Sequence, residues 1–180
     1  LAAESYVSSS FEKPQATWRK FPIFNQNGSG SCVAQTLAKI LGVMYWIKNQ
    51  VYVHFSATHL YQRRFNKPSP GMLAPDAFAI AQKSATLEQL VPSQNMTDVA
   101  MDATVIEKYK DDVGVIFKSA KPIDLPIQDI DVIASTIQTT GKAIMVWFFF
   151  GMDEWNKPVP EIKNPSLTLP NAPGLHSVTA

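Results

Sequence analysis

The stretch Asn25-Gln26-Asn27-Gly28-Ser29-Gly30-Ser31-Cys32-Val33-Ala34 decides the fold of this 180-residue chain. Its two glycines permit positive φ angles and a close approach of neighbouring backbone, so we predict a loop that leads directly into a helix. From residue 32 to about residue 48, apolar side chains cover almost every face of that helix. A helix that is apolar nearly all round is buried in the centre of a domain. The pattern therefore places Cys32 in the first turn of a buried helix.

Cys32 is the only cysteine in the chain, which excludes a disulfide framework. Unpaired backbone N–H groups and the positive end of the helix dipole favour a thiolate at this position, so we expect the reactive form to be populated near neutral pH. The same N–H groups, together with the side-chain amide of Gln26, can stabilise the oxyanion that forms when a thiolate adds to a carbonyl. The alternative at this point is an inert cysteine, buried as a small apolar residue.

The composition excludes several classes of protein. Hydrophobic residues make up 46% of the chain and charged residues 17%, which predicts one or two compact domains rather than disorder. The 16 Lys and Arg residues nearly balance the 15 Asp and Glu residues, so we expect no nucleic-acid partner. Gln35, Thr36 and Lys39 interrupt the apolar helix, which predicts no membrane span. Gly28 and Gly30 lack the remaining residues of a phosphate-binding loop, and we expect neither a cofactor nor a metal.

Helices come first along the chain and strands afterwards, which indicates an α+β fold. Residues 1–17 are polar and predict an extended arm. We predict a mainly helical unit over 18–111 and a β-rich unit over 112–180, with the chain ending at Ala180 in mid-strand. Beyond the helix at 32–48, the predicted helices span 56–66, 75–84, 98–111 and 127–140. The predicted strands span 113–117, 143–150 and 176–180, with a proline-rich excursion over 151–175.

The residues around Cys32 resemble those of the papain-like cysteine peptidases. That family combines a glutamine, a glycine-rich loop and a cysteine with a histidine about 130–150 residues downstream. Here the corresponding residues are Gln26, Cys32 and His176, and His176 follows Cys32 by 144 residues (176 − 32). The weaker similarities extend the resemblance over residues 18 to 180. They are Trp18-Arg19, Phe55-Ser56-Ala57, Leu60-Tyr61, the segment from Gly71 to Pro92, and Leu175-His176-Ser177-Val178.

The resemblance implies a papain-like fold with two subdomains and an active-site cleft between its helical and β-rich halves. It also implies a cysteine endopeptidase in which Cys32 is the nucleophile, His176 the general base and acid, and Gln26 part of the oxyanion hole. The backbone around Gly71 and Met72 would pair with an extended polypeptide substrate. Trp147 and Ser177 would border the main specificity pocket, where a bulky Trp147 favours small or flat side chains.

The sequence departs from the family pattern at three places. Ser29 stands where most members have a disulfide cysteine, and Val33 replaces an aromatic residue after the nucleophile. The family's third residue, an asparagine, lies tens of residues beyond the histidine, whereas this chain ends four residues after His176 (180 − 176). Asn164 and Asn171 precede His176 and do not match that asparagine. We therefore expect a Cys–His dyad, with a separate C-terminal fragment or an assembly partner completing the fold.

Two other functions are compatible with the sequence. One is an inactive papain-like scaffold or binding module within a larger assembly. The other is a different Cys–His acyl-transfer enzyme, such as a peptidoglycan amidase, although such enzymes usually place the histidine much closer to the cysteine. His54 and His59 lack a catalytic context and are expected to be structural. The absence of disulfides favours the cytoplasm or a bacterial or viral particle, among which the sequence does not choose.

Overall fold

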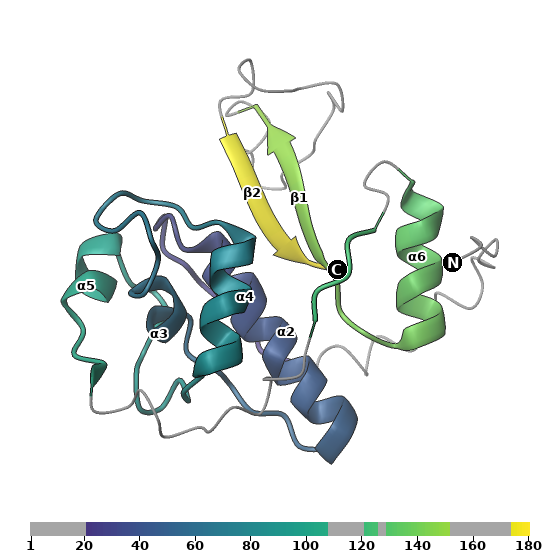
Figure 1. Ribbon diagram of the computed structural model, residues 1–180, viewed down its shortest axis with the longest axis horizontal. Coiled ribbons are helices and arrows are strands. Elements are labelled where there is room, and N and C mark those ends of the chain that lie inside the picture. The colour runs from purple at the N-terminus through teal and green to yellow at the C-terminus, as the bar shows by residue number, and fades with distance from the viewer. Residues whose placement is uncertain (1–20, 108–120, 126–128, 152–173) are drawn as a thin grey trace.

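The computed structural model describes residues 21–107, 121–125, 129–151 and 174–180. In chain order the described elements are α2 (Cys32–Asn49), α3 (Ala57–Tyr61), α4 (Ala74–Lys83), α5 (Asp98–Ala103), α6 (Ile130–Thr140), β1 (Met145–Phe150) and β2 (Gly174–Thr179). Figure 1 shows α3, α4 and α5 gathered on one side of the molecule, α6 on the opposite side, and the two strands lying side by side. The predicted arm at 1–17, the strand at 113–117 and most of the excursion at 151–175 lie outside the described residues.

Helix α2 begins at Cys32, as predicted, and lies at the centre of the core. Its apolar residues Val33, Leu37 and Leu41 are nearly inaccessible to solvent and belong to one cluster with side chains of α3 and α4. Burying each such side chain stabilises the fold by about 1.5–3 kcal/mol. The helix ends where Gln50 adopts a left-handed conformation, with φ of 58°, and donates its N–H to the carbonyl of Trp46.

Helices α3 and α5 are shorter than predicted. The helix predicted over 56–66 ends at Tyr61, although Ser56 caps its start by accepting the His59 N–H at 3.1 Å. The Phe65 N–H, which would continue the helix by donating to the Tyr61 carbonyl, donates to the Asp76 carboxylate at 2.8 Å instead, and the Tyr61 carbonyl accepts the Arg64 guanidinium at 3.0 Å. Helix α5 ends at Ala103 rather than running through residue 107, and its cap is Thr97. Residues 108–111 of that prediction lie outside the described residues.

Strands β1 and β2 form an antiparallel pair in which Trp147 lies opposite Ser177 and Phe148 opposite His176. Ile144 and Ala180 exchange both of their backbone hydrogen bonds, each at 2.9 Å. Because hydrogen-bonded and non-hydrogen-bonded pairs alternate along an antiparallel ladder, the Trp147–Ser177 pair is of the second kind. The backbone N–H and C=O of Ser177 therefore point away from β1, along the outer edge of the pair.

Candidate active site

The loop before Cys32 is built on a tight turn. Asn27 and Gly28 both have positive φ angles, 49° and 70°, and the Ser29 N–H donates to the Gln26 carbonyl at 3.0 Å. An Asn-Gly pair suits such a two-residue turn, because these residues tolerate the left-handed conformation. The Ser29 hydroxyl donates to the same carbonyl at 2.7 Å. The turn thus fixes Gln26 in relation to the start of α2.

A carboxylate on α5 joins this loop to the segment around Gly71. The Gly30 N–H donates to the two oxygens of Asp98 at 3.0 and 3.2 Å, and the Tyr61 hydroxyl donates to Asp98 at 2.6 Å. The Gly71 N–H in turn donates to the Tyr61 hydroxyl at 3.1 Å. Burial, with the hydrogen bond to Asp98, raises the pKa of Tyr61 and keeps its hydroxyl protonated. One chain of hydrogen bonds therefore runs from the loop before the cysteine to Gly71.

A second carboxylate on α5 holds the segment that leads to Gly71. Asp102 accepts two hydrogen bonds from Arg64, at 2.7 and 2.8 Å, and this pairing lowers the pKa of Asp102. The Arg64 side chain is fully buried and also donates to the carbonyls of Pro68 and Ser69. Two-pronged arginine–carboxylate pairs fix geometry as well as supplying energy. Asp102 therefore holds the loop that precedes Gly71 through the buried guanidinium.

The thiol of Cys32 lies among three backbone N–H groups, those of Ser177, Val33 and Cys32 itself. Each of them lowers the pKa of the thiol, but burial is the larger influence and raises that pKa above its ordinary value. This corrects the expectation that the helix N-terminus alone populates the thiolate near neutral pH. A thiolate at Cys32 needs a positively charged partner or a base in addition.

His176 is carried by β2, immediately before the residue whose N–H points at the thiol. Its ring meets the rings of Phe148 and Phe150 edge-on, with centroids 5.8 and 6.5 Å away. Burial lowers the pKa of His176 and favours the neutral imidazole. The structure thus brings the Cys32 thiol to the edge of the strand that bears His176, across 144 residues of sequence (176 − 32).

Helix α2 contacts β2 through Thr36, one turn after Cys32. The Thr36 hydroxyl donates to the Ser177 carbonyl at 3.0 Å and lies 3.2 Å from the Ser177 hydroxyl, which donates to it. The Thr179 hydroxyl donates to the Thr36 carbonyl at 3.4 Å. Residues four apart on a helix share a face, so Cys32 and Thr36 meet the same strand edge.

Gln26 and Gly71 both have partners within the chain. The Gln26 side-chain amide donates to the Ser29 carbonyl at 2.9 Å, which leaves its second N–H as a donor. The Gly71 N–H, which we expected to pair with substrate, donates to Tyr61, and its carbonyl accepts from the Asn66 amide at 3.2 Å. The Met72 side chain is buried in the core, at 7% exposure. A substrate at Gly71 therefore competes with Tyr61 for the backbone N–H.

Trp147 and Ser177, the two residues expected to border a specificity pocket, lie directly opposite each other in the strand pair. Their exposure differs sharply, since Trp147 is 41% exposed and Ser177 only 3%. The Ser177 hydroxyl is occupied by Thr36, which leaves the indole of Trp147 as the part of this pair that a bound molecule can touch.

Three residues that organise this region were not predicted from the sequence: Thr36, Tyr61 and Asp98. Thr36 did leave a signal, because it is a polar residue one turn after the cysteine in a helix that is otherwise nearly all apolar. An aspartate at a helix N-terminus is common in proteins, since it complements the helix dipole, so Asp98 gave no sign of its partners.

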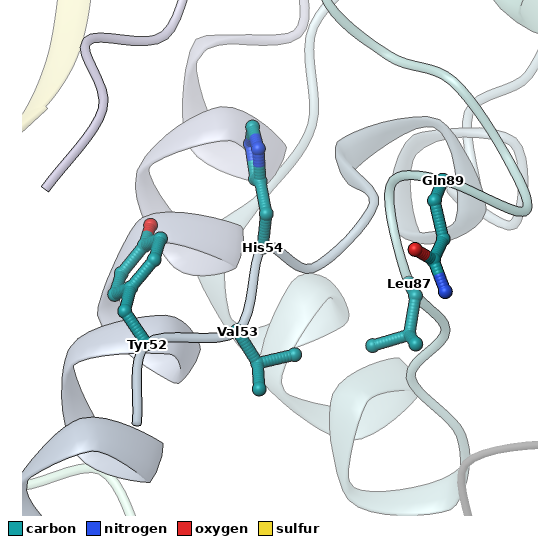
Figure 2. Close-up of a pocket in the computed structure, with 5 residues that line it drawn as sticks. All are labelled: Tyr52, Val53, His54, Leu87 and Gln89. Carbon is teal, nitrogen blue, oxygen red and sulfur yellow. The ribbon is translucent and has the colours of Figure 1, made fainter. Parts of the chain in front are cut away.

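The hollow drawn in Figure 2 lies apart from Cys32. It has a volume of about 250 Å³ and is lined by Tyr52, Val53, His54, Leu87 and Gln89. Tyr52 and Val53 pack against Gly42, in the half of α2 remote from the cysteine. Within the described ranges there is no group of three metal-ligating side chains, and no helix there is long and apolar enough to cross a bilayer.

Solved structures that resemble this chain include two cysteine proteases or their precursors. Digestive procathepsin L 3 from the larval midgut of Tenebrio molitor superposes with a TM-score of 0.63 and 16% identity, covering 98% of this chain and 57% of that one. Xylellain, a cysteine protease from Xylella fastidiosa, gives a TM-score of 0.55 and 18% identity, covering 88% of this chain and 65% of that one. No protein-family model and no curated protein sequence matches the chain.

The chain thus spans less than two thirds of the length of either structure that it resembles. At identities of 16% and 18% the likeness is one of fold, and function has to be argued from the residues of the site. The mixture of helices and strands agrees with that likeness. The chain has the general fold of the papain-like cysteine proteases.

Proposed function

We propose that this chain carries the nucleophile and the general base of a cysteine endopeptidase. The observation that supports this most directly is the position of the Cys32 thiol, at a helix N-terminus and against the N–H of the residue that follows His176. A thiol and an imidazole on facing elements are the parts that covalent acyl transfer requires. The papain-like fold of the chain supports the same assignment.

The reaction begins when His176 accepts the Cys32 proton and the thiolate adds to the carbonyl carbon of a peptide bond. The Cys32 N–H and the second N–H of the Gln26 amide bind the oxyanion that forms. His176 then protonates the leaving amine, the C–N bond breaks, and the acyl group remains on the sulfur as a thioester. Water, deprotonated by His176, hydrolyses the thioester and restores the thiol.

The burial of Cys32 and His176 bears on the step at which the proton moves between them. Because burial raises the pKa of Cys32 and lowers that of His176, the neutral pair is favoured over separated charges. The thiolate is stabilised by its three backbone N–H groups and by the imidazolium that forms beside it. We therefore assign the proton transfer to the step in which the substrate carbonyl is attacked, when the negative charge moves on to the oxyanion.

The proposed substrate is an extended polypeptide bound between the helical and β-rich parts of the chain. Trp147, half-exposed opposite Ser177, offers a flat apolar surface for a side chain of that peptide. The Gly71 backbone takes part only after its N–H has left Tyr61. We also propose that further polypeptide, on a separate fragment or a partner, completes the fold and supplies a residue to orient His176.

The test is the hydrolysis of a fluorogenic peptide library by the full-length protein and its variants. We expect Cys32→Ala to abolish hydrolysis and His176→Ala to slow it by about 10²–10⁴-fold, the usual contribution of a general base. His54→Gln, which removes a histidine remote from the thiol, serves as the matched control and should retain activity. Equal activity in the wild type and in Cys32→Ala would rule out the proposal.

An inactive scaffold or binding module is the second candidate, and one observation favours it. Burial moves the pKa values of both Cys32 and His176 toward their uncharged forms, as expected of an inert pair. Alkylation by iodoacetamide separates the two functions, because Cys32 is the only cysteine in the chain. A rapid reaction at pH 5–6 indicates an activated thiol, whereas a reaction that is appreciable only near the ordinary thiol pKa supports the scaffold.

A further inference from the structure

Within the part of the chain that the structure describes, the outer edge of β2 at Ser177 meets side chains of α2, and no further strand pairs with it there. A strand edge presents unpaired N–H and C=O groups that must find partners. At Ser177 the N–H points at the Cys32 thiol, and the carbonyl accepts the Thr36 hydroxyl at 3.0 Å. Cys32 and Thr36, one turn apart on α2, are therefore the partners of the N–H and the carbonyl of Ser177.

Thr36 makes most of the polar contacts of this junction that the structure describes. It donates to the Ser177 carbonyl, accepts from the Ser177 hydroxyl, and accepts from the Thr179 hydroxyl through its own carbonyl. Thr36 and Ser177 are 5% and 3% exposed, so water has little access with which to replace a lost bond. As a β-branched residue on a helix, Thr36 also has few rotamers, which fixes the direction of its hydroxyl.

We propose that Thr36 is a positioning residue of the active site. Through its bonds to Ser177 and Thr179 it fixes β2 against α2 in the position at which the Ser177 N–H meets the Cys32 thiol, and so fixes the strand that carries His176, the preceding residue. Thr36 touches neither the substrate nor the reacting atoms and acts only through β2. The expected effect of Thr36 on peptide hydrolysis rests on the proposed function of Cys32 and His176. Its expected effect on the reactivity of the Cys32 thiol does not depend on that function.

The experiment compares three variants of the full-length protein. Thr36→Val keeps the β-branched shape and removes the hydroxyl, and Thr36→Ser keeps the hydroxyl. Thr58→Val is the matched control, because Thr58 is fully buried and its hydroxyl donates to the Pro92 carbonyl at 2.7 Å, in another part of the core. The control reproduces the chemical change and the burial without touching β2.

Two readouts are measured on each variant. For peptide hydrolysis we expect Thr36→Val to lower kcat by about 10²-fold, the usual effect of a displacement of about 1 Å, with KM nearly unchanged. For iodoacetamide alkylation of Cys32 we expect the pH profile of Thr36→Val to move upward by about one unit, since the thiol loses the Ser177 N–H. In Thr36→Ser and in Thr58→Val, both kcat and the pH profile of alkylation should stay near those of the wild type.

The two readouts separate the failure of this inference from the failure of the proposed function. A Thr36→Val profile that coincides with the wild type, or an equal shift in Thr58→Val, overturns the role of Thr36 whether or not the protein hydrolyses peptides. Absence of hydrolysis in the wild type contradicts the peptidase, while the alkylation profile still decides the positioning role. A shift confined to Thr36→Val and reversed in Thr36→Ser supports it.

Discussion

The two sides of the candidate site are held by different chemistry. On the cysteine side, Asp98 and Asp102 of α5 fix the neighbouring loops through Gly30, Tyr61 and Arg64. On the histidine side, β2 is held to α2 by neutral hydroxyl groups centred on Thr36. Hydrogen bonds to charged groups contribute about 1.5–3 kcal/mol each, and neutral ones about 0.5–1.5 kcal/mol. We therefore expect the contacts on the cysteine side to be the stronger ones, and the contacts between α2 and β2 to be the more easily changed by substitution.

This difference predicts where substitutions act. Changes on the cysteine side should appear mainly in the free energy of unfolding, because the Arg64 guanidinium there is buried and its carboxylate partner is largely covered. Changes on the histidine side should appear mainly in catalysis, because the hydrogen bonds that set β2, the strand of His176, against α2 come from neutral hydroxyl groups. The following four substitutions test that division.

The largest effect is expected for Asp102→Ala, which leaves the fully buried Arg64 side chain without its carboxylate. Breaking one partner of a buried ion pair typically costs about 3–5 kcal/mol. Urea unfolding, followed by circular dichroism, measures the loss. Asp76→Ala is the control, because among the described residues that carboxylate accepts one hydrogen bond, from the exposed backbone N–H of Phe65, and its loss should cost about 1 kcal/mol or less. Equal losses in the two variants would show that the buried pair does not hold the cysteine side.

Acid should weaken the cysteine side through His59. Burial, reinforced by the nearby charge of Arg63, lowers the pKa of His59 to about 4, and its ring nitrogen Nε2 lies 3.0 Å from the Ser84 hydroxyl. Its other ring nitrogen has no hydrogen-bond partner within the described residues, so a second proton there would be buried without an acceptor. The folded protein therefore resists protonation that the unfolded chain accepts near pH 6.5.

The stability that comes from neutral His59 is complete above about pH 6.5 and is lost as the pH falls from there through 4. The total loss is roughly 3 kcal/mol, because the pKa of His59 is about 4 in the folded protein and about 6.5 in the unfolded chain. The measurement is the free energy of unfolding at pH 7, 6, 5 and 4 for the wild type and for His59→Gln. The difference between the two proteins should shrink toward acid, and a constant difference would show that His59 does not titrate in this range.

Asp98→Asn should have an intermediate effect. The Asp98 carboxylate accepts hydrogen bonds from the Gly30 N–H and the Tyr61 hydroxyl. In Asp98→Asn the NH₂ group of the amide faces one of these two donors, and two donors cannot form a hydrogen bond. We expect a loss of about 1–3 kcal/mol in the free energy of unfolding. Tyr61→Phe removes one of those donors, so the double variant should cost less than the two single losses together. Simple additivity in this cycle would contradict a shared network.

The smallest effect is expected for Thr179→Val, on the histidine side. The Thr179 hydroxyl is 3.4 Å from the Thr36 carbonyl, which is a long hydrogen bond. Its loss should cost about 0.5 kcal/mol and change peptide hydrolysis less than Thr36→Val does. If the two variants lowered kcat equally, the positioning of β2 would be spread along the strand rather than centred on Thr36.

Structural features that depend on residues adjacent in sequence could be predicted from the sequence alone. The start of α2 at Cys32 follows from a glycine-rich loop next to an apolar run, and the structure confirms it. The strands predicted over 143–150 and 176–180 are found at Met145–Phe150 and Gly174–Thr179, because runs of β-branched and aromatic residues favour extended chain. The resemblance to papain-like peptidases is supported at the level of the fold.

The features that were missed depend on contacts between distant segments. At the end of α3 the Phe65 N–H donates to Asp76 of α4, and the Tyr61 carbonyl accepts the Arg64 guanidinium, which is itself held by Asp102. The pKa of Cys32 combines the local helix terminus, which a sequence reveals, with burial by the whole fold, which it does not. For the same reason the occupied N–H of Gly71 was unforeseen, since its partner Tyr61 is placed by Asp98.

Gly30 limits how this protein can be redesigned. A methyl group on its Cα would lie 2.5 Å from the Gly71 nitrogen and 3.0 Å from the Pro70 side chain. The loop before the cysteine and the loop at Gly71 are thus in direct backbone contact, and neither can be lengthened or exchanged alone. Grafting a foreign loop at 66–71 to change substrate preference would shift Gly30 and, two residues later, the sulfur itself. The two loops have to be transplanted as a pair, together with Tyr61 and Asp98.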